Sequence, residues 1–248
     1  RNMLKEVKER DSLKYQRILL KLSGEAFGGE KGGLDLHSVE TVAQTIQAVH
    51  QNTGAEIAIV VGAGNLFRGR YVDGTKVDRV VADQIGMLGT IMNALALQEA
   101  MERLGENVRV MSAISINQLC EPFIRRKALS YLENGMIVIM AGGTGNPYMT
   151  TDSAAAIRAA EFKCNVLLKA SNVDAVYDRD PHLFADAKPL DMVTFQFAIE
   201  NNLNIMDISA FSFCQAANIP IIVFNFQNPG NLERIIRGEK IGTLVSSY

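Results

Sequence analysis

The sequence predicts an α/β protein, a three-layer αβα sandwich around a largely parallel central sheet. Short runs rich in Val and Ile, without polar alternation, are typical of strands that are buried on both faces. Amphipathic segments with helical spacing separate these runs, which is the pattern of β-α-β units. The composition, 48% apolar and 21% charged among 248 residues, is that of a folded globular chain.

The strands are predicted from the apolar runs. They cover residues 18–21, 56–61, 108–112, 136–141, 166–169, 221–226 and 243–245. Helices are predicted where apolar residues recur every three or four positions, at 36–51, 80–104, 124–132, 153–162, 210–217 and 232–237. No linker rich in Pro, Ser or Gly divides the chain. We therefore expect one domain over residues 15–248, preceded by a polar extension over residues 1–14.

Charge and composition exclude several classes of protein. The 25 basic and 27 acidic residues give a net charge of −2, which argues against general nucleic-acid binding. Three scattered Cys and three scattered His predict neither a disulfide framework nor a zinc site. The charged N-terminus has no apolar signal region, and the longest apolar runs are far shorter than the ~20 residues of a membrane span. We expect a cytoplasmic protein without membrane contact.

Three predicted strands run directly into glycine-rich turns, at residues 21–24, 62–65 and 142–147. Ligands of open α/β sheets bind at the carboxyl ends of strands, and glycine lets the backbone approach them closely. Three such turns at one sheet edge predict a polyphosphate cradle. Neither the P-loop motif nor a G-x-G-x-x-G turn opening a helix is present, so the common nucleotide-binding fingerprints are excluded.

Charged residues are expected at the same edge. Lys21 and Lys169 end apolar strands, where burying an ammonium is costly unless it meets an anion. Asp152 begins a predicted helix, where it either caps the helix or orients the two lysines. Asp83, one turn into the long helix, is a candidate acceptor for a sugar hydroxyl. The carboxylates of residues 174–180 either help to hold Mg²⁺ or form a solvated turn.

Five segments in order resemble the bacterial uridylate kinases, a branch of the amino-acid kinase fold family, over about residues 17–246. The segments are K-L-S-G-E-A (21–26), G-A-G-N-L-F-R-G (62–69), D-Q-I-G-M-L (83–88), G-T-G-N-P-Y-M-T-T-D (143–152) and V-Y-D-R-D-P (176–181). The resemblance implies the amino-acid kinase fold and phosphoryl transfer from Mg²⁺-ATP to UMP. It also implies a homohexamer, activation by GTP and inhibition by UTP.

The resemblance also assigns site residues. It implies a catalytic group of Lys21, Arg68, Asp152 and Lys169. The implied ATP-binding residues are Lys21, Leu22, Ser23, Gly24, Gly64, Arg68, Ser171, Tyr177 and Asp180. The implied UMP-binding residues are Ala63, Asp83, Thr144, Gly145, Asn146, Pro147, Tyr148, Met149, Thr150 and Thr151. No protein ligand to the metal is expected, since Mg²⁺ would be held mainly by the nucleotide phosphates.

The chain departs from the family pattern at a few positions. Ala63 stands where the family usually has Gly, Ser171-Asn172 replaces Thr-Lys, and Met149 stands where an aromatic residue is common. Residues 27–34 form a loop one residue shorter than in some relatives. Two alternatives stay open: another carboxylate or carbamate kinase of the same fold, and a nucleotide-binding regulator or oxyanion storage protein without turnover. The segment 143–152 argues against the first, and Lys21 with Asp152 against the second.

Overall fold

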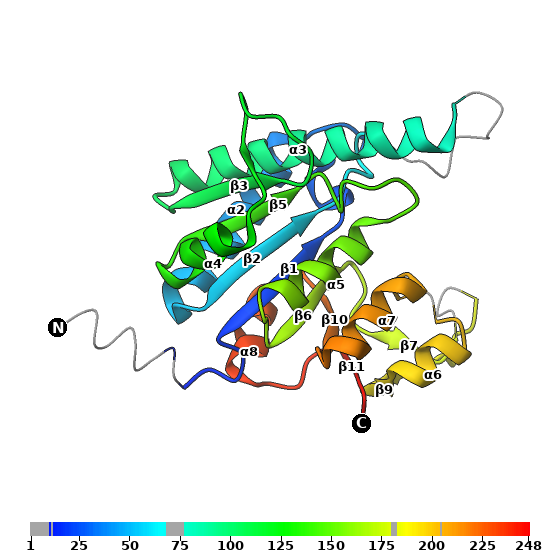
Figure 1. The fold of residues 1–248 in the computed structure, drawn as a ribbon. Helices are drawn as coiled ribbons and strands as arrows, with labels where there is room; N and C mark the ends of the chain where they lie inside the picture. Colours follow the sequence, from blue (N-terminus) through cyan, green and yellow to red (C-terminus); the bar gives the residue numbers. More distant parts are fainter. Residues whose placement is uncertain (1–9, 11, 68–76, 180–182, 204) are drawn as a thin grey trace.

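A nine-stranded sheet forms the centre of the computed structural model, which describes residues 10, 12–67, 77–179, 183–203 and 205–248 (Figure 1). All neighbouring strands are parallel except β10 and β11. Along the sheet the order is β4 (Glu121–Pro122), β3 (Val108–Ser112), β5 (Ile137–Ala141), β2 (Glu56–Val61), β1 (Arg17–Leu22), β6 (Val166–Ser171), β10 (Ile221–Asn225), β11 (Thr243–Ser246) and β9 (Met192–Thr194).

Helices cover both faces of the sheet, so strand residues alternate between two apolar cores. Leu20 of β1 faces one core, and Leu19 faces the other. The first core is closed by α2 (Leu36–Thr53), α3 (Arg79–Arg103) and α8 (Asn231–Arg237). The second is closed by α4 (Arg125–Glu133), α5 (Thr151–Glu161), α6 (Phe195–Glu200) and α7 (Ile208–Ala217). The predicted three-layer α/β sandwich with a largely parallel sheet is confirmed.

The structure adds short elements that the sequence pattern did not predict. These are β4, β9, α6, the 3-10 helix η1 (Gly24–Phe27), and a separate antiparallel pair of β7 (Val176–Tyr177) and β8 (Pro189–Leu190). Each is two to six residues long, too short for a hydrophobic period to be read. Of these, β4 and β9 form the two edges of the nine-stranded sheet, and the predicted central strands are unchanged.

The start of the chain contacts the sandwich before β1 begins. Arg10 pairs with Glu56 at 3.1 Å, and the Leu13 side chain is buried in the first core. Residues 1–9 and 11 lie outside the described part of the chain. The boundary of the polar extension at residue 14 stays a prediction.

Helix α3 carries much of the site described below. By length and composition alone it is long and apolar enough to cross a membrane. In this fold it packs against β3, β5 and α2, and it buries Ile91, Ala94 and Leu97 in the first core. An apolar helix that lies on a sheet passes the same composition test as a membrane span.

Candidate active site

The first two glycine turns touch at the carboxyl ends of β1 and β2. The Gly62 amide donates to the Leu22 carbonyl at 2.8 Å. A Cβ on Gly24 would lie 2.2 Å from the Gly64 nitrogen, closer than any side chain tolerates. Position 24 is therefore limited to glycine by the neighbouring backbone, and the two turns form one continuous surface.

The third glycine turn leads from β5 into α5. Gly142 has a φ of +78°, and its amide donates to the Thr90 hydroxyl of α3 at 2.8 Å. Thr150 caps α5, because its hydroxyl accepts from the Ser153 amide at 3.3 Å. Asp152 is thus not the cap, and its carboxylate points to other partners.

Those partners are two lysines from neighbouring strands. Lys21 Nζ of β1 lies 3.0 Å from Asp152 Oδ1, and Lys169 Nζ of β6 lies 3.2 Å from Asp152 Oδ2. Lys169 also donates to the Ile205 carbonyl. Two cations and one anion leave a net positive charge at a largely buried position, which suits a phosphate group. We call these three residues the lysine cluster.

Burial and charge act against each other in the lysine cluster. Burial raises the pKa of Asp152, but the charges of Lys21 and Lys169 and the hydrogen bonds they donate together outweigh it and hold the pKa below its usual value. Burial lowers the pKa of Lys169, and the Asp152 carboxylate offsets only part of that effect. The carboxylate is therefore ionised, and Lys169 gives up its proton more readily than an exposed lysine.

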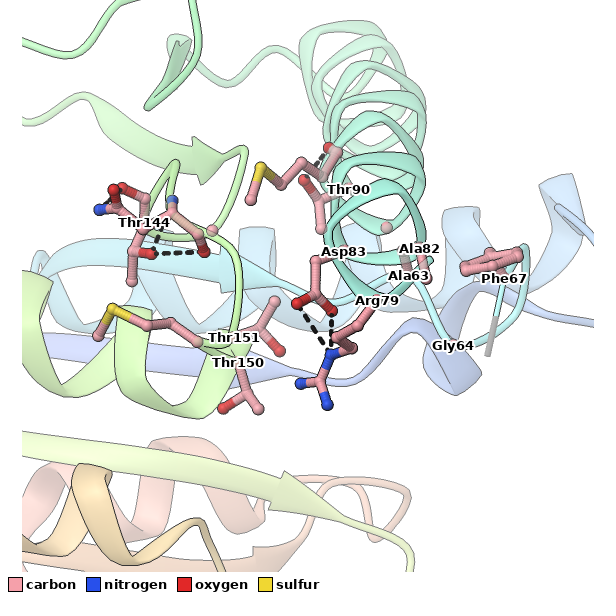
Figure 2. A pocket seen from close by; sticks show the side chains of 15 residues that line it. Ala63, Gly64, Phe67, Arg79, Ala82, Asp83, Thr90, Thr144, Thr150 and Thr151 are labelled. Carbon is pink, nitrogen blue, oxygen red and sulfur yellow. Dashed lines mark hydrogen bonds and ion pairs between the residues drawn. The ribbon is translucent and has the colours of Figure 1, made fainter. Parts of the chain in front are cut away.

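A cavity of about 250 Å³ lies between α3 and the third turn (Figure 2). This volume is slightly below the ~300–1,000 Å³ found for small-molecule pockets. Seven residues expected at the UMP site line it: Ala63, Asp83, Thr144, Asn146, Met149, Thr150 and Thr151. Gly64, expected on the ATP side, lines it as well. Gly145, Pro147 and Tyr148 belong to the same loop but do not line the cavity.

Asp83 reaches the cavity from α3, and both oxygens of its carboxylate accept hydrogen bonds from neighbouring residues. Both of its oxygens accept from Arg79 Nε, at 3.0 and 2.9 Å, and Oδ2 also accepts from the Tyr148 amide at 2.7 Å. Figure 2 shows Arg79 and Asp83 pointing into the space between α3 and the start of α5. Arg79 was missed by the sequence reasoning, although its spacing of four residues from Asp83 on a helix is a recognisable ion-pair signal.

The residues expected on the ATP side follow the neighbouring strands β1 and β6. Leu22 ends β1, Ser23 and Gly24 come next, and Ser171 ends β6, which pairs with β1. Tyr177 lies in β7, and none of these residues lines the cavity. The remaining two candidates, Arg68 and Asp180, lie outside the described residues.

The carboxylates of residues 174–180 that the structure describes do not converge. Asp174 accepts from the amides of Asn225 and Asn228, at 2.9 and 3.3 Å. Asp178 accepts from the Lys188 backbone amide at 2.8 Å. Within the described ranges there is no group of three or more His, Cys, Asp or Glu that is arranged to hold a metal ion.

Asp207 is a further charged residue beside the lysine cluster that the sequence reasoning missed. It precedes α7, its carboxylate accepts from the Thr150 hydroxyl, and its charge acts on Lys169. The spacing of 57 residues between Asp207 and Thr150 explains why no local pattern indicated the contact.

Comparisons with known proteins show the family of the chain. The profile of the amino acid kinase family matches residues 16–225. A uridylate kinase of Xanthomonas oryzae pv. oryzae is 50% identical over 235 residues, which is 94% of this chain and 97% of that protein. The UMP kinase structure from Bacillus anthracis superposes with a TM-score of 0.91 at 38% identity, covering 94% of this chain and 96% of the other. That from Ureaplasma parvum gives 0.86 at 36% identity, covering 94% and 99%. The chain belongs to the amino acid kinase family, within its uridylate kinase branch.

Proposed function

We propose that this protein is a nucleoside monophosphate kinase that transfers the γ-phosphoryl group of ATP to UMP, giving UDP and ADP. The observation that carries the proposal is the lysine cluster of Lys21, Asp152 and Lys169, which lies at the sheet edge where the glycine turns meet. Phosphoryl transfer needs mainly alignment and stabilisation of negative charge. A buried cluster with net positive charge beside backbone turns supplies both.

The transfer itself requires no general base. The UMP phosphate is already an anion, so one of its oxygens attacks the γ-phosphorus in line while the bond to the ADP oxygen breaks. Lys21 and Lys169 balance the charge on the equatorial oxygens, and Asp152 keeps the two ammonium groups apart and oriented. Arg68 would add a further cation at the transfer site.

The two substrates would occupy neighbouring parts of the same edge. UMP would fill the cavity between α3 and the third turn, with Asp83 at its ribose and residues 144–151 around its base and phosphate. ATP would lie over the ends of β1 and β6, with its phosphates against residues 21–24 and its adenosine near Ser171, Tyr177 and Asp180.

We propose that Mg²⁺ enters with the ATP phosphates. The Asp152 carboxylate is held by two ammonium groups, which makes it a poor direct ligand for a cation. Mg²⁺ favours a few oxygens together with substrate phosphates, and it would supply further charge neutralisation at the phosphoryl group. The chain's own contribution is the lysine cluster and the amides of the glycine turns.

Assembly, regulation and location are proposed from the family. We propose a cytoplasmic homohexamer with responses to GTP and UTP. Light scattering distinguishes a monomer of 27.2 kDa from an assembly of six such chains. Initial rates with added GTP or UTP test the regulatory responses.

A coupled assay offering UMP, CMP, dUMP and acetylglutamate in turn tests the activity. Turnover with UMP alone is the expected result. Turnover with acetylglutamate would indicate a carboxylate kinase of the same fold, and no turnover with any acceptor would indicate a non-catalytic nucleotide-binding protein. The Lys21→Met variant is expected to lose transfer of labelled phosphate from ATP to UMP, and a near wild-type kcat would remove Lys21 from the mechanism.

A further inference from the structure

Two polar side chains of α3 are buried at the cavity: Thr90 is one of the residues that line it, and Asn93 lies one turn further along the helix. Thr90 is 2% exposed and Asn93 is fully buried, and residues three apart lie on the same face of a helix. Neighbours on the buried face of this helix, such as Ile91 and Ala94, are apolar. A buried hydroxyl or amide costs free energy unless each polar atom has a partner, so the partners of these two residues are informative.

Thr90 connects α3 to the third glycine turn. Its hydroxyl donates its single proton to the Met87 carbonyl within the helix, at 2.6 Å. The same oxygen accepts from the Gly142 amide at 2.8 Å. The hydroxyl proton is therefore not available for a ligand in the cavity, and the bond that leaves the helix is the one to the turn.

Asn93 connects α3 to the second glycine turn. Its amide nitrogen donates to the Gly62 carbonyl and to Asn65 Oδ1, both at 2.8 Å. Asn65 returns a bond to Asn93 Oδ1 at 3.1 Å. Since a carbonyl only accepts, the bond to Gly62 defines which way the Asn93 amide faces. The two residues that Asn93 binds, Gly62 and Asn65, flank Ala63 and Gly64 in the sequence, and Ala63 and Gly64 line the cavity.

The two turns supply different parts of the cavity wall, Ala63 and Gly64 from one, Gly143 and Thr144 from the other. One rigid helix thus holds both. Building on the proposed function, we propose that Thr90 and Asn93 are positioning residues that set the separation of these two walls, and hence the fit of the acceptor nucleotide. They act through the backbone of the turns, outside the lysine cluster.

Thr53 provides a matched control for Thr90. It is also 2% exposed, its hydroxyl donates to the Val49 carbonyl at 2.6 Å, and it accepts from the Ala55 amide at 3.2 Å. It ends α2 shortly before β2 begins, so it lies near the amino end of β2, whereas the cavity lies at the carboxyl ends of the strands. Thr90→Val and Thr53→Val therefore remove equivalent hydrogen bonds, one at the cavity and one away from it.

We expect Thr90→Val to raise KM for UMP roughly 10-fold, the scale of one or two lost hydrogen bonds, with KM for ATP changed less than about twofold. Thr53→Val should leave both constants unchanged. Thr90→Ser keeps the hydroxyl and should behave as the wild type. If Thr90→Ser raised KM for UMP while Thr90→Val left it unchanged, the methyl group of Thr90 would be the part that matters. Thr90 would then contact the ligand directly, and the proposal would be overturned.

Asn93→Asp tests the second turn with a side chain of the same size. It removes both donors and sets a carboxylate against the Gly62 carbonyl, so KM for UMP should rise at least as much as in Thr90→Val. Thermal unfolding of each variant identifies any that fail to fold, and a folded Thr90→Val variant carries the test of the third turn independently of Asn93→Asp. A folded Asn93→Asp variant with an unchanged KM for UMP would overturn the role of Asn93.

Amide hydrogen exchange separates this proposal from the proposed function. Thr90→Val should speed exchange of the Gly142 amide, and Thr53→Val should speed that of Ala55 instead. A wild-type protein that does not phosphorylate UMP refutes the proposed function, and exchange then decides whether Thr90 holds the turn. Unchanged protection of Gly142 in Thr90→Val, or faster exchange with an unchanged KM for UMP, would overturn the positioning role.

Discussion

Asp152 is the residue on which the arrangement of charges depends. Its carboxylate lies between the ammonium groups of Lys21 and Lys169, at 3.0 and 3.2 Å, and all three side chains are largely buried. A position in the first turn of α5 adds a favourable helix dipole. Without the carboxylate, two like charges would face each other in a medium that solvates them poorly.

The Asp152→Asn variant should therefore lose both activity and stability. We expect kcat to fall at least about 100-fold, because the lysines lose their orientation. The free energy of unfolding should fall by roughly 3 kcal/mol, the cost of leaving buried charges unpaired. Initial rates and urea denaturation measure the two effects.

Asp186→Asn, which changes a 76% exposed carboxylate, is the control and should alter neither quantity. A kcat for Asp152→Asn within twofold of the wild type would show that Asp152 does not orient the lysines.

The lowered pKa of Lys169 predicts a limit on the alkaline side of the rate profile. The proposed mechanism uses the Lys169 cation, which is lost as pH rises through the lowered pKa, so kcat should decline at a pH below 10.5, the usual lysine value. Asp207 raises the pKa of Lys169, so Asp207→Asn should move the decline to lower pH. Rates between about pH 7 and 10 measure this, with circular dichroism confirming that the protein stays folded. An unchanged profile in Asp207→Asn would exclude Lys169 as the titrating group.

At the scale of elements, α3 is shaped to fit the second glycine turn. A Cβ on Gly89 would lie 2.8 Å from the Cβ of Ala63, so the methyl group of Ala63 occupies the space left by the missing side chain on the helix. Ala63 is one of the positions where this chain departs from the usual family pattern. The helix accommodates that departure at Gly89.

Gly89→Ala should destabilise the protein although alanine favours helices. The intrinsic preference of about 1 kcal/mol for Ala over Gly is outweighed by overpacking against Ala63, which costs roughly 1–3 kcal/mol. Adding Ala63→Gly removes the contact and should restore the stability. Urea denaturation of the two single variants and the double variant gives the coupling energy. Additive effects would show that the two residues do not touch in solution.

Elements with their own hydrophobic period were predictable from the sequence, and elements without one were not. Strands β1, β2 and β5 each contain an uninterrupted apolar run that is buried on both faces of the sheet. β4 and β7 are two residues long and exist because a neighbouring strand pairs with them. Helix α6 has six residues, less than two turns, so its amphipathic pattern is incomplete.

The residues of the candidate site can be divided in the same way, into those that a local sequence signal indicates and those that it does not. Lys21 and Asp152 stand next to glycine turns or helix starts, which are local signals. The contacts of Thr90 and Asp83 with the third turn join residues 52 and 65 positions apart. Such contacts depend on how α3 packs on the sheet, and no local pattern contains that information.

At the scale of the whole molecule, the second core buries two of the three cysteines. Burial raises the pKa of both Cys164 and Cys214 to about 12, so almost no thiolate forms at neutral pH. Burial also raises the pKa of Cys120, but this side chain is partly exposed. Mass spectrometry of iodoacetamide labelling at about pH 8 should show Cys120 modified before the other two. In denaturant all three should react alike, and early labelling of Cys164 in the native protein would show that the second core opens.

The fit between Ala63 and Gly89 limits the order in which these positions can change during evolution. Of the four combinations of alanine and glycine, the one with alanine at both sites brings two methyl groups into conflict. A lineage with the reverse pair, glycine in the turn and alanine on the helix, can therefore reach the present pair by single steps only through glycine at both positions. The residues that the second turn tolerates at position 63 therefore depend on the residue at position 89 of α3. The effect of a substitution at either site can be predicted only when the residue at the other is known.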